Sequence, residues 1–228
     1  GNILIVDTVS PTRTVSYSPA KQVVDKKTLR TIEDYGYSAE NTGAILYYDG
    51  AMQLTLEIAE ANFYAEDVKA AVDEKEVEVT GWSRQGDVWT GSIPVSGEGD
   101  HIVTVEYTDR SSNEMVSYTS EQITIDKKKP VIDVSYTPDE RVLETDEKRY
   151  YAQGQTAVIT ITERNFRAED VEAEITAKNI AGDDIAAQDY AEYLKRPGSW
   201  VRDGDRHTAR ITFSSDADYT FDIGYTDL

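Results

Sequence analysis

Carboxylates are the residues of this 228-residue sequence whose types and spacing could do chemistry, because several recur at corresponding positions of an internal repeat. They lie near predicted strand ends, where hard oxygen ligands from neighbouring loops can bind Ca²⁺. The spacing matches no calcium-binding motif, so solvated acidic corners remain the alternative. The candidate calcium ligands are Glu60, Asp67 and Asp109, their counterparts Glu163, Asp170 and Asp227, and Asp126 at the predicted joint between the two copies.

Aromatic rings are the second set of candidates, because exposed rings offer large rigid surfaces on which a carbohydrate can stack. Trp82 and Trp200 occupy equivalent positions of the repeat, which favours a packing role common to both copies. Trp89 is replaced by His207 in the second copy, so this position accepts different rings and is a candidate for ligand contact. The candidate ligand residues are Trp89, Tyr190 and Tyr193.

Other reactive groups are scarce. The chain has no cysteine, which excludes thiol catalysis and thiolate metal sites, and it has two histidines. His207 aligns with Trp89 and His101 with Tyr219, and a general base cannot be exchanged for tryptophan. No glycine-rich phosphate loop or metalloprotease helix occurs. We therefore expect no enzymatic activity.

An internal repeat determines where these residues stand. Residues 82–90 (WSRQGDVWT) reappear as residues 200–208 (WVRDGDRHT), a shift of 118 positions. Upstream, residues 62–68 (NFYAEDV) match residues 165–171 (NFRAEDV) at a shift of 103. Self-similarity at a fixed spacing is the signature of repeated structural modules.

The changes of shift locate two insertions, which are typical of loops on a shared scaffold. We predict two domains, near the modal domain size. The first covers residues 1–125, with an insertion at residues 20–46. The second covers residues 126–228, with an insertion at residues 179–197, and lacks the last strand of the first copy. Residues 126–130 form the short linker between them.

Alternation of apolar and polar residues predicts the strands. Residues 52–58 and 157–161 have the period of two that buries one face of a strand, and residues 82–95 read as a hairpin around a Gly-Asp turn. Residues 2–6 correspond to residues 122–125, and each run is typical of the last strand of a domain. Many short strands without a long helix indicate an all-β fold of two β-sandwiches.

The charge limits the partners. The formal net charge is −20 at pH 7, so nucleic acids and anionic membrane surfaces would repel the chain. No apolar run approaches the roughly 20 residues that span a bilayer, so we expect no membrane insertion.

The ending seen at residues 107–113 (YTDRSSN) resembles that of the tandem bacterial immunoglobulin-like (Big-type) repeats in cell-surface proteins of Gram-positive gut bacteria. The family's Asp-Ala-Gly-Asn-type ending is matched at Asp109 and Asn113, and in the second copy at Asp227 alone. The resemblance implies two tandem immunoglobulin-like β-sandwiches, located outside the cell on the bacterial surface or in the wall.

The expected function is therefore that of a structural stalk or spacer, whose partners are neighbouring immunoglobulin-like repeats of the same chain. One alternative is an adhesin or carbohydrate-binding module, with its site on the inserted loops and a host glycan or glycoprotein as partner. A second alternative is an accessory segment of a large extracellular hydrolase. Calcium is the one cofactor that the residues suggest.

Overall fold

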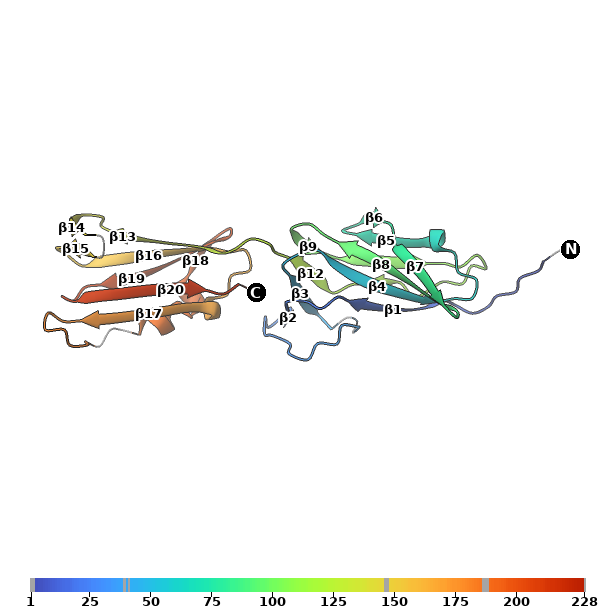
Figure 1. The fold of residues 1–228 in the computed structure, drawn as a ribbon, viewed down its shortest axis with the longest axis horizontal. Helices are drawn as coiled ribbons and strands as arrows, with labels where there is room; N and C mark the ends of the chain where they lie inside the picture. Colours follow the sequence, from blue (N-terminus) through green and yellow to red (C-terminus); the bar gives the residue numbers. More distant parts are fainter. Residues whose placement is uncertain (1–2, 39, 41, 146–147, 186–188, 228) are drawn as a thin grey trace. The chain divides into compact units, whose positions relative to one another are not determined.

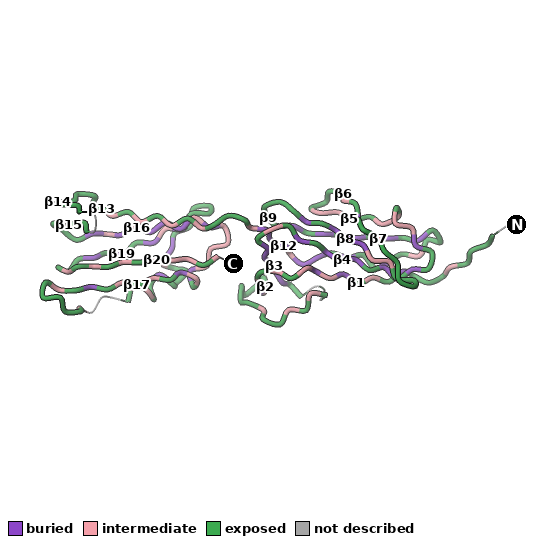
Figure 2. The backbone as a smooth tube through the Cα atoms, viewed as in Figure 1, coloured by how far each residue is buried: buried purple, intermediate pink, exposed green. Residues whose placement is uncertain are grey.

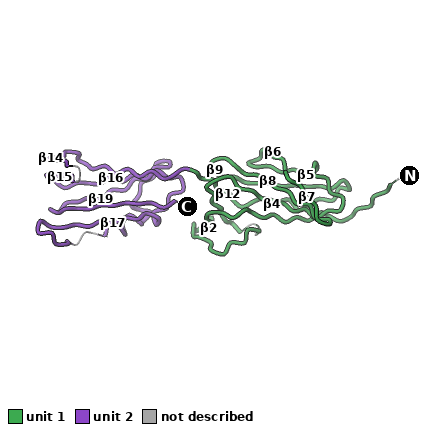
Figure 3. The backbone as a smooth tube through the Cα atoms, in the orientation of Figure 1, with its two compact units in different colours: residues 1–127 green, residues 128–228 purple. Residues whose placement is uncertain are grey.

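The computed structural model describes residues 3–38, 40, 42–145, 148–185 and 189–227. The chain forms two compact units, Gly1–Lys127 and Lys128–Leu228 (Figure 3). Both are built from small, mostly antiparallel sheets, so the expected all-β class is confirmed. Among the described residues there is one short α-helix, and no helix is long and apolar enough to cross a membrane.

The described residues of the first unit form three four-stranded sheets (Figure 1). One has the order β1 (Thr12–Tyr17), β4 (Met52–Ala59), β8 (Val88–Val95), β7 (Thr80–Gln85). The second has the order β11 (Tyr118–Thr119), β10 (Val103–Tyr107), β5 (Val68–Val72), β6 (Lys75–Val77). The third has the order β2 (Gln22–Asp25), β3 (Ala44–Tyr48), β12 (Gln122–Ile125), β9 (Gly99–His101).

The alternating pattern of β4 sets the position of the first core. Leu54, Leu56 and Ile58 are completely buried, whereas Gln53 and Glu57 on the other face are exposed. These side chains pack with apolar residues from all three sheets, and the buried segments run through the middle of the unit (Figure 2). A one-residue slip of β4 would expose this whole set, so the pattern also fixes the strand's register.

Strand β12 closes this core. It runs parallel to β3, with Ile123 opposite Leu46, and antiparallel to β9, with Ile123 opposite His101. Ile123 and Ile125 point into the core and are completely buried. The last strand of the first unit is therefore a central strand of its sheet and not an edge strand.

The predicted hairpin is present in both copies. Strands β7 and β8 are joined at Gly86, whose φ of 64° is the left-handed conformation that glycine adopts without strain. Its counterpart Gly204 has a φ of 60° and joins β18 (Val201–Asp203) to β19 (Arg206–Phe213). The positive φ at this turn thus explains why both copies have glycine there.

The second unit repeats part of this plan. One sheet has the order β13 (Val131–Thr137), β16 (Gln155–Thr162), β19, β18, which is the order of β1, β4, β8 and β7. Strand β17 (Val171–Lys178) pairs with β20 (Asp218–Tyr225), and β14 (Arg141–Glu144) pairs with β15 (Arg149–Tyr151). The described residues after β20 include no counterpart of β11 or β12.

Two sequence expectations need correction. The insertion at residues 20–46 was expected to be a loop, but it begins with strand β2, which pairs antiparallel with β3. Residues 3–6, the run typical of a last strand, form no strand, because no neighbouring strand lies beside them (Figure 1). The remaining elements are the short turns η1 (Ala65–Asp67), η2 (Ala168–Asp170) and η3 (Pro197–Ser199), and the helix α1 (Tyr190–Leu194).

Candidate functional site

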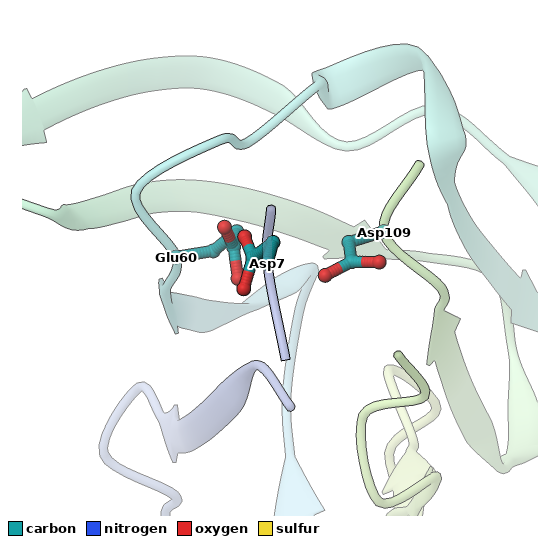
Figure 4. Close-up of side chains that lie close together, drawn as sticks. All are labelled: Asp7, Glu60 and Asp109. Carbon is teal, nitrogen blue, oxygen red and sulfur yellow. The ribbon is translucent and has the colours of Figure 1, made fainter. Parts of the chain in front are cut away.

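Three carboxylates lie close together in the first unit (Figure 4). Asp7 precedes β1, Glu60 directly follows β4, and Asp109 lies just after β10. One carboxylate oxygen from each lies within 4.8 Å of the others. Glu60 and Asp109 are two of the calcium ligands predicted from the sequence, and the structure brings them together with Asp7, which was not predicted.

Backbone amides hold the two buried carboxylates in place. Glu60 and Asp109 are 6% and 5% exposed. The Glu60 carboxylate accepts a hydrogen bond of 2.7 Å from the Asn62 amide, and the Asp109 carboxylate accepts bonds of 2.8 Å from the amides of Ser111 and Asn113. Aspartate at the start of a tight turn commonly accepts such bonds, so the local sequence explains how Asp109 is fixed.

Two asparagine side chains attach the N-terminal segment to this site. Asn62 Nδ2 donates to Asp7 Oδ2 at 2.8 Å. Asn113 Nδ2 donates to Asp109 Oδ2 at 2.8 Å and to the backbone oxygen of Asp7 at 3.2 Å. Neither asparagine was expected to belong to a site, although both stand in the repeated or family-like motifs.

The charges of the three groups are not balanced by any ion pair with a Lys, Arg or His in the described part of the chain. Burial raises the pKa of Glu60, and the negative charges of Asp7 and Asp109 raise it further. The hydrogen bond from Asn62 lowers the pKa of Asp7. Three close carboxylates are a donor set that suits a hard cation such as Ca²⁺, with waters completing the six to eight ligands it needs.

Glu60→Gln is expected to stabilise the first unit at neutral pH when a chelator is present. A raised pKa means that ionised Glu60 opposes folding, so its effect is absent below the ordinary pKa of 4.5 and grows as pH rises above it. The glutamine oxygen still accepts the bond from Asn62. Urea unfolding of both proteins between pH 4 and 8 measures the difference, and equal midpoints at pH 7 would contradict the argument.

The same pair of proteins tests calcium. At about 100 times its dissociation constant, a bound ion would stabilise the wild-type unit by roughly 2.7 kcal/mol, and the variant by less. Identical melting curves of the wild-type protein in calcium and in chelator would show that the three carboxylates do not bind Ca²⁺.

The other predicted calcium ligands lie elsewhere. Asp67 accepts a bond of 2.9 Å from Arg110 Nε, and Asp170 one of 2.6 Å from Arg167 Nε. In the second unit, Glu163 is 3% exposed and accepts a bond of 2.7 Å from the Asn165 amide, which reproduces the geometry of Glu60. Asp126 belongs to the first unit and Asp227 to the second.

Phenylalanine at the start of the repeated NF motif organises the rings of each unit. Phe63 is buried and lies with its ring centroid 4.8 Å from Trp82, 5.0 Å from Trp89 and 5.4 Å from Tyr107. The candidate ligand residue Trp89 is therefore stacked on Phe63 at an interplanar angle of 27° and is only partly exposed. This arrangement favours a packing role for Trp89.

The second unit reproduces this cluster with one substitution. Phe166 lies 4.9 Å from Trp200, 4.2 Å from His207 and 5.4 Å from Tyr225. His207 takes the place of Trp89 in the stack and is 6% exposed, with Nε2 3.1 Å from the backbone oxygen of Glu163. Its neighbours are those of a ring packed in the interior.

Acid is expected to destabilise the second unit through His207. Burial lowers the pKa of this imidazole, so the folded state resists a proton that the unfolded chain accepts. Stability should therefore fall as pH drops below the ordinary value of 6.5. His207→Phe, which keeps the ring stack, should flatten this dependence when unfolding of the second unit is followed between pH 5 and 8. An unchanged slope would contradict it.

The helix expected in the second insertion is present. In α1, Leu194 is completely buried, and Tyr190 packs against the core with its hydroxyl donating to the Thr212 oxygen at 2.6 Å. Tyr193 is 37% exposed. Among the three candidate ligand residues, Tyr193 is exposed, whereas Trp89 and Tyr190 are partly buried.

A shallow pocket of about 390 Å³ lies beside this helix. It is lined by Ile175 and Ala177 of β17, Asp184 and Ile185 of the insertion, and Tyr190 of α1. The second insertion therefore offers both a concave surface and an exposed ring.

Comparison of the sequence with models of known protein families gave no match, and comparison with curated proteins gave none either.

Proposed function

We propose that the two units are tandem immunoglobulin-like β-sandwich modules that act as a non-catalytic spacer in a secreted or wall-attached bacterial surface protein. The repeated sheet order of β1, β4, β8 and β7 in β13, β16, β19 and β18 supports the shared module. The ending at residues 107–113 supports the resemblance to bacterial surface repeats.

The path of the chain through the first unit is the observation that carries this proposal. The chain enters before β1 at one end of the unit and leaves after β12 at the opposite end (Figure 1). Residues 126–130 alone then separate β12 from β13. A module whose two ends lie far apart lengthens a chain and transmits tension through its folded body, which is the work of a spacer.

The pairing of the terminal strands fits this role. Strand β1 pairs with β4 over six positions, from Thr12 opposite Ala59 to Tyr17 opposite Leu54. Tension applied along β1 loads these hydrogen bonds together and not one after another. Strand β12 is held on both sides, by β3 and by β9.

Single-molecule stretching of the whole chain tests the proposal. The first unit should unfold in one step that releases residues 12–125, a gain in length of up to roughly 400 Å for an extended chain. A unit that yields without a distinct force peak would contradict a load-bearing role.

The pocket beside α1 favours one alternative, a module that binds a host glycan or glycoprotein. Binding of the chain to an immobilised panel of both, with and without calcium, separates the two functions. Tyr193→Ala should weaken binding without changing the fold, since its ring is exposed on α1, the helix that lines the pocket through Tyr190. Deletion of residues 179–197 would also remove the completely buried Leu194, so it is not a clean test of binding. Lys27→Ala, which removes an exposed side chain of the first insertion, is the control. A folded sample that binds nothing leaves the spacer proposal in place.

A further inference from the structure

A pocket of about 600 Å³ lies in the first unit where the chain passes from β6 to β7, the edge strands of their sheets. Val79, which is 7% exposed, forms part of its apolar wall. The other apolar residues of the wall are only partly buried, so an apolar group can still cover them. They are Ala65, Val68, Val77 and Trp82.

In the second unit, the residues equivalent to three of these wall residues are covered. Ala168 and Val171, equivalent by the shift of 103, and Trp200, equivalent by the shift of 118, are 3%, 1% and 9% exposed. Leu194 of α1 is completely buried in the same core cluster. Its backbone oxygen accepts a hydrogen bond of 2.7 Å from Trp200 Nε1. A leucine therefore completes this surface in the second unit.

The first unit has a different residue at this point. By the same shift of 118, Glu76 stands at the position of Leu194, and its side chain is exposed. Within the described part of the chain, Trp82 Nε1 has no hydrogen-bond partner, unlike the indole of Trp200. The first unit thus presents an indole N–H and an uncovered apolar wall where the second unit has Leu194.

The rim of the pocket is acidic. Three glutamates line it, Glu66, Glu76 and Glu78. Glu66 is paired with Arg110 at 2.7 Å. The exposed carboxylates of Glu76 and Glu78 have no ion-pair partner among the residues that the structure describes. Unbalanced negative charge beside an apolar wall favours a partner that brings an apolar side chain and positive charge together.

We propose that this pocket is a docking site for a peptide segment of a partner protein in which a leucine is followed by basic residues. The leucine covers Trp82, and its backbone oxygen accepts the hydrogen bond from Trp82 Nε1. The basic residues pair with Glu76 and Glu78 while their apolar stems lie along the wall. This site is independent of the spacer proposal, because a spacer needs no docked partner.

The chain itself contains a segment with this pattern. Residues 194–196 read Leu-Lys-Arg, and they directly follow the turn of α1 that covers Trp200. This segment is engaged in its own unit, since Leu194 is completely buried there. It therefore provides the model for a partner segment and a sequence for the probe.

NMR titration of the whole ¹⁵N-labelled chain with an acetylated and amidated peptide of residues 190–197 (YAEYLKRP) tests the proposal. The chain has three tryptophans and thus three indole N–H signals, which Trp→Phe variants assign. The Trp82 signal should shift and saturate, because its Nε1 gains a hydrogen bond. The Trp200 signal should stay in place, because its Nε1 is already bonded. Added salt should weaken binding by screening the charges.

Charge reversal tests which residues recognise the peptide. Glu76→Lys combined with Glu78→Lys should weaken binding by about tenfold or more. Glu33→Lys combined with Asp34→Lys changes the net charge equally at exposed residues outside the pocket, so this control should bind like wild type.

Two altered peptides complete the test. A peptide with glutamate in place of both basic residues should bind the protein with lysines at positions 76 and 78 more tightly than it binds wild type. A peptide with alanine in place of the leucine should bind more weakly than the original peptide to wild type, because it leaves Trp82 uncovered.

The outcomes decide for or against the site. A Trp82 signal that does not move up to several millimolar peptide overturns the proposal. So does equal weakening in the Glu33 and Asp34 control, since binding would then follow net charge alone. A shift confined to Trp200 would mean that the peptide exchanges with α1. A Trp82 signal that responds to a neutral glycan and not to the peptide would make the pocket a carbohydrate site and would overturn the proposal as well.

Discussion

Trp200→Ala is expected to destabilise the second unit by about 3–5 kcal/mol, a large part of the stability of a small domain. The indole is 9% exposed and packs against Phe166 with the ring centroids 4.9 Å apart. Its Nε1 donates to the Leu194 oxygen at 2.7 Å, which holds the C-terminal end of α1 on the core. The substitution therefore leaves a cavity and also releases the helix.

Urea unfolding followed by hydrogen exchange separates the two units and measures this loss. Val201→Ala is the matched control, because the neighbouring side chain is 73% exposed and its truncation should cost less than about 0.5 kcal/mol. Trp200→Phe should recover part of the packing but not the hydrogen bond to Leu194. A loss below about 1 kcal/mol in Trp200→Ala would mean that the indole is not part of the core.

Trp82→Ala in the first unit should cost less than its counterpart, because Trp82 is only partly buried. The indole lies over Gly91, where an added Cβ would come within 2.9 Å of Trp82 Cε3 and 2.7 Å of Val79 Cγ1. The second copy has Ala209 at this position. The two tryptophans therefore share a place in the repeat and an equivalent phenylalanine partner, but a glycine lies under Trp82 where the second copy has an alanine.

The sequence was sufficient for features that depend on local pattern. The alternation in β4 and β16, the turn glycines 86 and 204, and the short helix α1 were all expected and are observed. Equivalent positions of the repeat also predicted a packing role for Trp200, which is buried, whereas the exchange of Trp89 for His207 suggested an exposed position and His207 is buried as well. Periodicity and the repeat were enough here because each feature involves neighbours in the chain.

Features that depend on contacts between distant segments were not predicted. Asp7 lies beside Glu60 and Asp109, where it is held by Asn62 and Asn113, which are 55 and 106 positions away in the sequence. Asp67 and Asp109 were predicted as calcium ligands on the same ground, since both recur in the repeat near a strand end. In the structure, however, Arg110 donates a hydrogen bond to Asp67. Spacing along the chain carries no information about such neighbours.

Glu121→Ala is the second substitution expected to have a large effect, about 3 kcal/mol on the first unit. Glu121 is 7% exposed, and its carboxylate accepts hydrogen bonds from the Thr42 hydroxyl at 2.7 Å and the Ala44 amide at 3.1 Å. Alanine would leave the Ala44 amide without this partner at a buried position. Bonds to a charged group are stronger than neutral ones, so their loss outweighs the gain from removing a buried charge.

The position of Glu121 explains why the effect should spread. Its own amide donates to the Tyr17 hydroxyl at 2.8 Å, and that oxygen lies 2.6 Å from the Tyr118 hydroxyl. Glu121 therefore connects the end of the first insertion, through its carboxylate, with β1 and β11, through its backbone amide. Because β12 is a central strand, loosening its start should weaken pairing on both sides of it.

Hydrogen exchange of the Ala44 amide and urea unfolding measure the result. Glu121→Gln keeps one acceptor oxygen, so it should cost roughly half as much as alanine. Glu106→Ala, which removes an exposed carboxylate from β10, is the control for the change in net charge and should be close to neutral. If Glu121→Ala unfolds within about 0.5 kcal/mol of wild type, the insertion is held by its apolar contacts with the core, and the carboxylate is not its anchor.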